Sequence, residues 1–214
     1  MEDIKKQMKT GTTTVGLVCK DGIVLAADMR ATAGSLIVGK KTEKIQSITD
    51  DMAVTMAGTV SDAQLLIKLI KAELKLREIR TGRKQMVKEA ANLLGGLVYT
   101  NIRRMSMIPG ISHFLLGGKD EKGYYVYDIF PDGSVTLMDD YVSSGSGSEM
   151  AYGVLETSYK KDLSVEQGTS LVIKCINAAL QRDVNTGEGI NVVTITEKGV
   201  RKVFSKQGDA RISE

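Results

Sequence analysis

The feature that most constrains the fold is a continuous apolar run at residues 23–27, with the sequence IVLAA. A strand with one side in solvent alternates apolar and polar residues, whereas an unbroken apolar strand is covered on both faces. Asp21 and Gly22 separate the strand pattern at residues 23–28 from another at residues 12–19, which is a strong hairpin signal. We therefore predict that the chain opens with two paired strands that are packed on both sides.

A helical period appears after these strands. The capping-box residues Ser61 and Gln64 precede apolar residues that recur every three or four positions, and this pattern stops at Gly82. A second helix is predicted at residues 87–102, although its Gly95-Gly96 pair weakens it unless another helix approaches closely there. Two helices in succession are expected.

The second half of the chain repeats this alternation. One helix is expected from Ser148, and another from the capping box of Ser164 and Gln167 to about Arg182. Further strand patterns occur at residues 35–38, 43–48, 52–57, 111–116, 124–130, 134–138, 190–195 and 200–204. The order of strands, two helices, strands, two helices and strands favours two sheets face to face with helices outside. The predicted fold class is α+β, a four-layer αββα sandwich.

Composition excludes several classes of function. The 29 Lys and Arg residues exceed the 26 Asp and Glu residues by only three, which is too small a surplus for a phosphate-binding stripe, so a nucleic-acid partner is not expected. With one His and two Cys that lack CxxC spacing, we expect no metal and no cofactor. His113 fits a strand histidine, and Cys19 and Cys175 fit buried free thiols.

Nothing in the sequence predicts a membrane segment. No window reaches the roughly 18 consecutive apolar residues of a span, and the first ten residues lack the apolar region of a signal peptide. We expect a soluble, cytoplasmic protein with no membrane partner.

The most conspicuous glycine cluster is Gly145-Ser146-Gly147. Position 150 is Met, so the cluster does not complete a GxGxxG nucleotide loop. The simpler interpretation is a tight turn that caps the helix from Ser148. Nucleotide binding by this loop stays open as an alternative.

The junction of Gly11 and Thr12 suggests a different chemistry. A short polar leader meets a hydroxyl-rich strand start through the smallest residue. If the bond between them is hydrolysed, Thr12 carries both a hydroxyl nucleophile and a free α-amine, whose pKa of roughly 8 lets it accept the hydroxyl proton near neutral pH. Such a residue needs no histidine, although a threonine triplet is also an ordinary strand start.

A set of motifs in this order resembles the proteasome β subunits of the archaeal type, from Gly11 to about residue 195. The residues that carry the resemblance are the segment GTTTVGL from Gly11, Asp28 and Arg30, Lys44, Ala57-Gly58 with the segment SDAQ from Ser61, the segment SGSGS at residues 144–148, the segment YGVLE from Tyr152, and Arg182-Asp183. Each motif is weak alone, but the ordered set is specific. The resemblance implies an N-terminal-nucleophile hydrolase fold and a threonine endopeptidase. It implies that residues 1–11 are a propeptide removed autocatalytically between Gly11 and Thr12, and that residues 12–214 form a single catalytic domain.

The resemblance also implies roles for individual residues. Thr12 is the nucleophile, Lys44 lowers the pKa of its amine and hydroxyl, and Asp28 holds Lys44. The amide of Gly58 is the oxyanion-hole donor. Ser146 and Asp183 hydrogen-bond the α-amine and Thr12, and Thr186 stands where the family usually has a serine, so the hydroxyl is retained. Arg30 resembles a further position near the site.

Substrate specificity and partners follow from the same resemblance. The expected substrate-binding residues are Ala31, Thr32, Thr42, Met56 and Val60. Small or apolar residues in such a pocket favour large apolar side chains before the scissile bond, with Met56 as the pocket floor. The implied partners are other β subunits in a heptameric ring, α-subunit rings, and unfolded polypeptide delivered by an ATPase. The alternative is a catalytically inactive structural subunit of the same ring.

Overall fold

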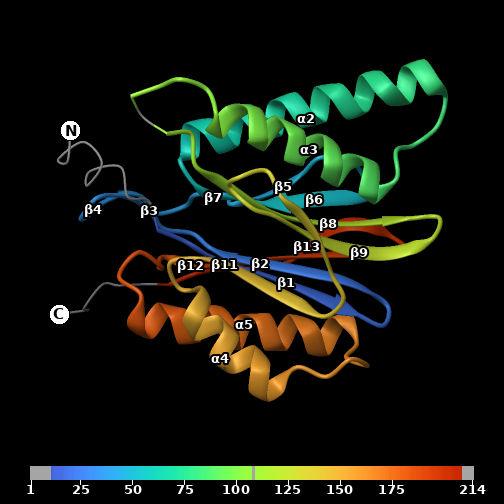
Figure 1. The fold of residues 1–214 in the computed structure, drawn as a ribbon. Coiled ribbons are helices and arrows are strands. Elements are labelled where there is room, and N and C mark those ends of the chain that lie inside the picture. Colours follow the sequence, from blue (N-terminus) through green and yellow to red (C-terminus); the bar gives the residue numbers. More distant parts are fainter. Residues whose placement is uncertain (1–10, 108, 209–214) are drawn as a thin grey trace.

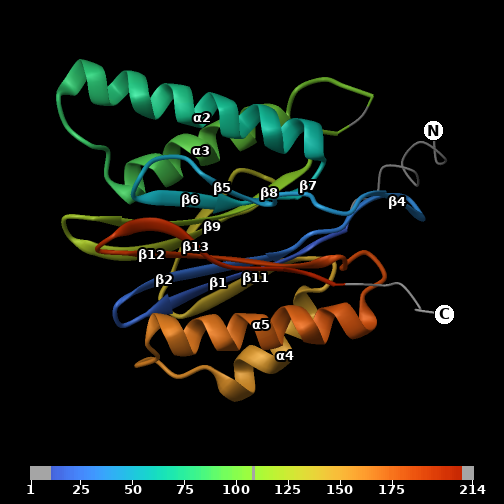
Figure 2. The same cartoon turned by 180° about the vertical axis from the view of Figure 1, so that it is seen from behind.

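The computed structural model describes residues 11–107 and 109–208, so residues 1–10 of the expected propeptide lie outside the described residues. Two sheets pack face to face, with helices α2 and α3 over one and helices α4 and α5 over the other (Figure 1). The opposite view shows the same four layers (Figure 2). This arrangement confirms the predicted four-layer αββα sandwich.

The first sheet contains the two opening strands. Its spatial order is β11-β1-β2-β12-β13, with antiparallel neighbours throughout. The strands are β1 (Thr13–Cys19), β2 (Gly22–Asp28), β11 (Tyr141–Gly145), β12 (Gly189–Thr196) and β13 (Gly199–Gln207). All seven residues of β2 are buried, which confirms that this continuous apolar strand is covered on both faces.

The second sheet has the order β10-β9-β8-β6-β5, and the short strand β7 pairs with β8. Its strands are β5 (Ile45–Ser47), β6 (Met52–Thr55), β7 (Ala57–Gly58), β8 (Ser112–Asp120), β9 (Gly123–Ile129) and β10 (Val135–Met138). A separate ribbon of β3 (Ala31–Ala33) and β4 (Leu36–Gly39) extends from one end of the sandwich. His113 lies in β8, where its Nε2 is 2.5 Å from Oδ1 of Asp128 on β9, which confirms a strand histidine with a partner.

The helices follow their predicted positions closely. They are α2 (Val60–Thr81), α3 (Val87–Ile102), α4 (Ser148–Ser158) and α5 (Val165–Arg182). The capping box of α5 is confirmed, because Ser164 Oγ accepts from the Gln167 amide and Gln167 Oε1 accepts from the Ser164 amide. The capping box predicted at Ser61 is wrong: the N-cap of α2 lies two residues earlier, at Thr59, whose amide donates to the carbonyl of Ile111.

The glycine pair within α3 is approached by a strand and not by another helix. A Cβ at Gly95 would lie 2.4 Å from Cγ2 of Val135, so the element that approaches closely is strand β10. Gly96 has open space around it. The close contact of a strand with α3 requires glycine at position 95.

Buried apolar residues form three groups that match the three layer boundaries. One lies between α2, α3 and the second sheet, one between the two sheets, and one between the first sheet and α4, α5. Cys19 and Cys175 are free thiols in the last group, and burial raises the pKa of each to about 12. Both are therefore protonated packing residues.

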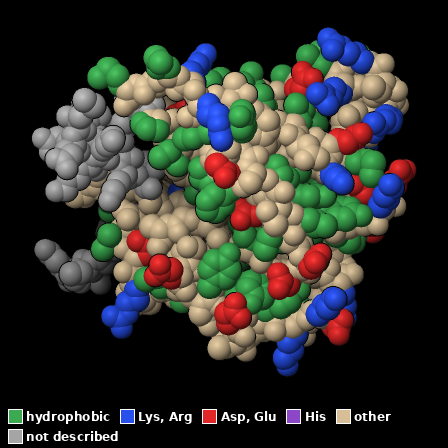
Figure 3. Space-filling model, in the orientation of Figure 1, with side chains coloured by type: hydrophobic (Ala, Val, Ile, Leu, Met, Phe, Trp, Pro, Cys, Tyr) green, Lys and Arg blue, Asp and Glu red, His purple; other side chains and the backbone are tan. Residues whose placement is uncertain are grey.

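The helices of residues 11–107 and 109–208 are all too short or too polar to cross a bilayer. On the face in Figure 3, basic and acidic side chains are interspersed with apolar ones.

Candidate active site at the start of β1

Thr12 immediately precedes β1, at the end of the sandwich where β2 finishes and the chain returns from α5 to β12. Only 4 % of the surface of Thr12 is exposed to solvent. The hairpin of β1 and β2 brings Asp28, the last residue of β2, beside the start of β1. The topology of the first sheet therefore places Thr12 next to a carboxylate sixteen residues away in sequence.

Asp28 organises this end of the sheet. Its side chain is fully buried, and Oδ1 accepts from Thr12 Oγ1 at 3.2 Å, from the Thr13 amide at 3.0 Å and from Lys44 Nζ at 2.7 Å. Oδ2 accepts from the amides of Arg30 at 3.1 Å and Gly187 at 3.0 Å. A buried carboxylate with this many donors is held in one orientation.

Lys44 forms a buried ion pair with Asp28, and its side chain is only 5 % exposed. Burial lowers the pKa of the Lys44 ammonium, although the Asp28 carboxylate opposes the change by stabilising the cation. Arg30 also lowers this pKa through charge repulsion. The proton on Lys44 is therefore held less firmly than on a surface lysine, beside the hydroxyl of Thr12.

A second chain of hydrogen bonds starts at the backbone of Thr12. The Thr12 nitrogen donates to Ser146 Oγ at 3.3 Å, and Ser146 Oγ donates to Asp183 Oδ2 at 2.6 Å. Thr186 Oγ1 donates to the same oxygen at 2.5 Å. Because the Thr186 proton is used in this way, Thr13 Oγ1, at 2.6 Å, donates to Thr186 Oγ1. The threonine hydroxyl at position 186 reaches Asp183 despite its additional methyl group.

The glycines at positions 145 and 147 make room for this network. A Cβ at Gly145 would lie 2.1 Å from the carbonyl oxygen of Thr12, and a Cβ at Gly147 would lie 2.1 Å from Thr13 Oγ1. Gly147 is also the N-cap of α4. The loop thus packs against the start of β1, which favours a role in orienting Thr12 over binding of a nucleotide.

Gly58 lies at the end of β7 with φ of +98°. A Cβ at this position would lie 2.3 Å from the carbonyl oxygen of Ile111, so only glycine fits here. Gly58 lines a small pocket beside Thr12. The pocket residues are Gly11, Thr12, Arg30, Ala31, Thr42, Lys44, Met56, Ala57, Gly58, Val60 and Ala63.

Four of the five predicted substrate-binding residues line this pocket, but Thr32 does not. The side chain of Thr32 instead accepts a hydrogen bond from the Gly11 amide at 3.2 Å. Asn185, which was not predicted from the sequence, packs so closely against Gly11 that a Cβ at position 11 would lie 1.9 Å from its Cβ. Thr32 and Asn185 therefore hold the residue on the leader side of the Gly11–Thr12 bond. No periodicity or motif marks Asn185, and its only signal in the sequence is that it follows Asp183 by two positions.

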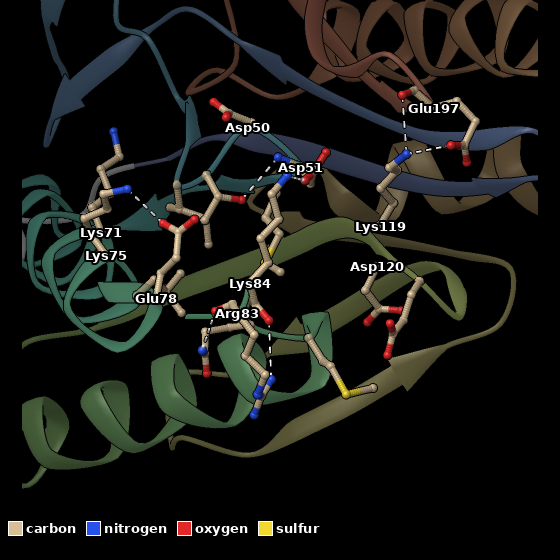
Figure 4. A pocket seen from close by; sticks show the side chains of 17 residues that line it. Asp50, Asp51, Lys71, Lys75, Glu78, Arg83, Lys84, Lys119, Asp120 and Glu197 are labelled. Carbon is tan, nitrogen blue, oxygen red and sulfur yellow. Dashed lines mark hydrogen bonds and ion pairs between the residues drawn. The ribbon is translucent and has the colours of Figure 1, made fainter. Parts of the chain in front are cut away.

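A larger cavity of 800 Å³ lies at the other end of the sandwich (Figure 4). It is lined by charged residues of both signs from the last turns of α2, the end of β8 and the turns after β5, α2, β8 and β12. Several of its cations are paired with carboxylates, as in Lys75 with Glu78 at 2.9 Å, Lys84 with Asp51 at 2.5 Å and Lys119 with Glu197 at 2.7 Å. Within residues 11–107 and 109–208, no group of three or more His, Cys, Asp or Glu side chains could hold a metal ion.

Comparison with known proteins agrees with this geometry. The family model described as "Proteasome subunit" matches residues 8–195. The chain belongs to the proteasome subunit family.

Relatives in this proteasome family are similar over nearly their whole length. The proteasome subunit beta of Ferroglobus placidus is 47 % identical over 88 % of this chain and 88 % of its own length. Proteasome subunit beta 2 of Pyrococcus abyssi is 44 % identical over 92 % of each chain, and the proteasome subunit beta of Archaeoglobus profundus is 41 % identical over 99 % of this chain and 96 % of its own. The proteasome match includes the Gly11–Thr12 junction and every candidate site residue.

Proposed function

We propose that this proteasome-family chain is a catalytic β subunit of the core particle, a threonine endopeptidase whose nucleophile is Thr12. The observation that carries the proposal is the buried triplet in which Asp28 Oδ1 accepts from Thr12 Oγ1 at 3.2 Å and from Lys44 Nζ at 2.7 Å. A buried ion pair that shares one carboxylate oxygen with a threonine hydroxyl, with burial lowering the pKa of its lysine, is typical of active sites and favours the catalytic over the structural subunit. In this proposal residues 1–11 are the propeptide and residues 12–214 the catalytic domain.

The first chemical step is attack of Thr12 Oγ on a peptide carbonyl carbon. Once the Gly11–Thr12 bond is cleaved, the free α-amine of Thr12 accepts the hydroxyl proton as the new C–O bond forms. The Lys44 cation lowers the pKa of that amine and hydroxyl, because a nearby positive charge disfavours the ammonium and favours the alkoxide. Ser146 and Asp183 hold the amine, since Ser146 Oγ already accepts from the Thr12 nitrogen.

The second half of the cycle releases both products. The Gly58 amide stabilises the oxyanion of the tetrahedral intermediate, and one such donor contributes roughly 3 kcal/mol in other hydrolases. The ammonium of Thr12 then protonates the leaving amine, and an ester between Thr12 Oγ and the acyl group remains. Water attacks this ester with its proton going to the Thr12 amine, so a carboxylic acid leaves and the hydroxyl is restored.

Removal of the propeptide uses the same nucleophile on its own chain. The Gly11 carbonyl belongs to the residue directly before Thr12, and Thr32 and Asn185 hold Gly11 in place. The nitrogen of Thr12 is an amide before cleavage and cannot act as a base. Burial lowers the pKa of Lys44 and so makes its deprotonated amine more accessible, and this amine is our proposed acceptor of the Thr12 hydroxyl proton. The proton passes to the Thr12 nitrogen as the Gly11–Thr12 bond breaks, and water then hydrolyses the ester formed between Gly11 and Thr12 Oγ.

The pocket beside Thr12 sets the substrate preference. Ala31, Val60 and Met56 give it small and apolar walls, so we propose cleavage after large apolar residues. Peptides with Leu, Phe or Tyr before the scissile bond should be cleaved faster than those with basic or acidic residues at that position.

The proposed setting is a cytoplasmic particle in which this subunit forms heptameric rings between rings of α subunits. An ATPase delivers unfolded polypeptide to the enclosed sites. Apolar side chains on the outer face of α2, such as Leu65, Leu69 and Leu76, are exposed in the single chain and offer surface for contacts between subunits.

The Thr12→Ala variant of the assembled protein tests the proposal. We expect mass spectrometry of the wild type to show loss of residues 1–11 and a new N-terminal threonine. The Thr12→Ala variant should assemble, retain its leader and cleave no peptide, whereas a Thr157→Ala control on the exposed surface of α4 should behave like the wild type. An intact leader in wild-type particles would identify an inactive structural subunit instead.

A further inference from the structure

The loop at residues 183–189, between α5 and β12, supplies much of the wall behind Thr12. Asp183 binds Ser146 and Thr186, and the Gly187 amide donates to Asp28 Oδ2 at 3.0 Å. The Gly187 carbonyl in turn accepts from the Met29 amide at 3.1 Å. The position of this loop therefore affects both hydrogen-bond networks of the site.

Glu188, within this loop, has an unusual backbone. Its φ of +66° makes it the single non-glycine residue with positive φ among residues 11–107 and 109–208. Glutamate has no special tolerance for the left-handed region, where glycine is the favoured residue. A side chain kept at such a position points to a function that offsets the strain.

The side chain of Glu188 binds Arg30. Arg30 follows Asp28, the last residue of β2, by two positions. Glu188 Oε1 lies 3.3 Å from Arg30 Nη2, and the Glu188 side chain is only 7 % exposed. Arg30 Nη1 donates to the carbonyl of Val184 at 2.8 Å, so one guanidinium bridges the start and end of the loop. The guanidinium also packs closely against Gly187, where an added Cβ would be 2.2 Å from Arg30 Cζ.

We propose that Glu188 is a positioning residue: by pairing with Arg30 it fixes the loop at residues 183–189 so that the Gly187 amide and the Asp183 carboxylate stay aligned with Asp28 and Thr12. Arg30 contributes at both ends of this connection, since its own amide donates to Asp28 Oδ2 at 3.1 Å. The ion pair thus connects the loop to the same carboxylate oxygen that the Gly187 amide binds. This inference rests on the proposed threonine peptidase activity.

Two variants of the assembled, full-length protein distinguish a positioning role of the Glu188 side chain from an effect of its positive φ alone. Glu188→Gly relieves the positive φ and removes the carboxylate, whereas Glu188→Gln keeps the shape and removes the charge. The control is Glu197→Gln, which neutralises a carboxylate that is 81 % exposed at the opposite end of the sandwich. For each we would measure kcat and KM on a Leu-containing peptide, leader removal by mass spectrometry, and the thermal unfolding midpoint.

We expect both Glu188 variants to lower kcat by tenfold to a hundredfold with KM within about twofold, because small displacements of catalytic groups cost this much. Glu188→Gly should lower kcat without lowering the unfolding midpoint. If Glu188 had a purely structural role, a loss of kcat would come with a lower midpoint. Glu188→Asp, which keeps the charge and suits positive φ better, should recover part of kcat. The Glu197→Gln control should match the wild type.

Wild-type kcat in Glu188→Gly and Glu188→Gln would overturn the positioning role while leaving the proposed peptidase intact. If Glu188→Gly fails to assemble, Arg30→Gln and Glu188→Gln are measured together with their double variant. Additive losses of kcat contradict the proposal, and a double loss no greater than either single loss supports it. If wild-type protein and Thr12→Ala show the same hydrolysis, the proposed function itself fails.

Discussion

The two ends of the sandwich both gather charged side chains, yet they differ in how those charges are held. At the Thr12 end, Asp28 and Lys44 are buried, and the carboxylate receives five donors within 3.2 Å. At the opposite end, the larger cavity is lined by pairs such as Lys84 with Asp51, in which the lysine side chain is 70 % exposed. Burial and convergent hydrogen bonds, rather than cavity size, therefore mark the candidate active site.

The largest effect is expected from Asp28→Asn. The variant removes the charge that pairs with buried Lys44, and breaking a buried pair costs roughly 3–5 kcal/mol of unfolding free energy. Peptide hydrolysis should fall at least about a thousandfold, because Thr12 and Lys44 lose their common partner. Denaturant unfolding and kcat/KM are the measurements.

The matched control for Asp28→Asn is Glu78→Gln in the opposite cavity. Glu78 pairs with Lys75 on the surface of α2, and both side chains are well exposed. We expect the unfolding free energy to change by less than about 1 kcal/mol and peptide hydrolysis to be unchanged. Equal losses in the two variants would contradict the distinction between the two ends.

Gly58→Ala should have the next largest effect. Its φ of +98° and a Cβ only 2.3 Å from the Ile111 carbonyl force the β7–β8 contact to move, which displaces the amide proposed to hold the oxyanion. We expect kcat to fall roughly 10²- to 10³-fold. The measurement is steady-state kinetics on assembled particles.

Gly82→Ala is the control for the backbone strain alone. Gly82 caps α2 with φ of +68°, but nothing lies within 4 Å of an added Cβ. The variant should lose about 1–2 kcal/mol of stability and keep its kcat. A comparable loss of kcat in Gly82→Ala would show that strain, and not the amide position, accounts for the Gly58 result.

A smaller effect is expected in the pH dependence of stability. Because burial lowers the pKa of Lys44 in the folded chain, the folded state releases this proton at a lower pH than the unfolded state does. The contribution of Lys44 to the unfolding free energy is then complete above the ordinary lysine pKa and is lost as pH falls through the lowered folded pKa. Wild-type stability should therefore rise relative to Lys44→Met between these two pKa values.

Chemical denaturation at a series of pH values tests this expectation. Lys71→Met, which removes a lysine from the opposite cavity, is the control, and its unfolding free energy is compared with that of the wild type over the same pH range. A wild-type curve parallel to that of Lys44→Met over the alkaline range would show that Lys44 titrates as a surface lysine does.

The smallest effect is expected from Lys84→Met. Its ion pair with Asp51 is largely solvent-screened, so the unfolding free energy should change by less than about 1 kcal/mol. Thermal unfolding and peptide hydrolysis should both match the wild type. A large loss of hydrolysis would show that the opposite end takes part in the reaction.

Periodicity predicted the fold well because the layers depend on which faces of each element are apolar. The fully buried strand β2 and the helices α2 and α3 followed from that pattern, while capping signals marked the starts of α4 and α5. Strand β11 was missed, since its hydroxyl-rich segment at residues 141–145 lacks a strong β signal and is held mainly by pairing with β1. The start of α2 was misplaced because a tertiary bond between Thr59 and Ile111 decides it.

The residues of the candidate site were also predicted only in part. The order of motifs was enough to select Thr12, Asp28 and Lys44, which the structure brings together. Asn185 and Glu188 were not predicted, because their contacts with Gly11 and Arg30 depend on how the loop at residues 183–189 folds back onto the sheet. Thr32 was assigned to the pocket, whereas its side chain binds the Gly11 amide.

The most direct test of the central claim is to identify the residue that a threonine-directed electrophile, such as a β-lactone, modifies in assembled particles. Peptide mapping by mass spectrometry should find the acyl adduct on a peptide that begins with Thr12, together with loss of hydrolysis. An adduct on any other side chain, or on a peptide that still contains Gly11, would contradict the claim that Thr12 is the nucleophile freed by cleavage.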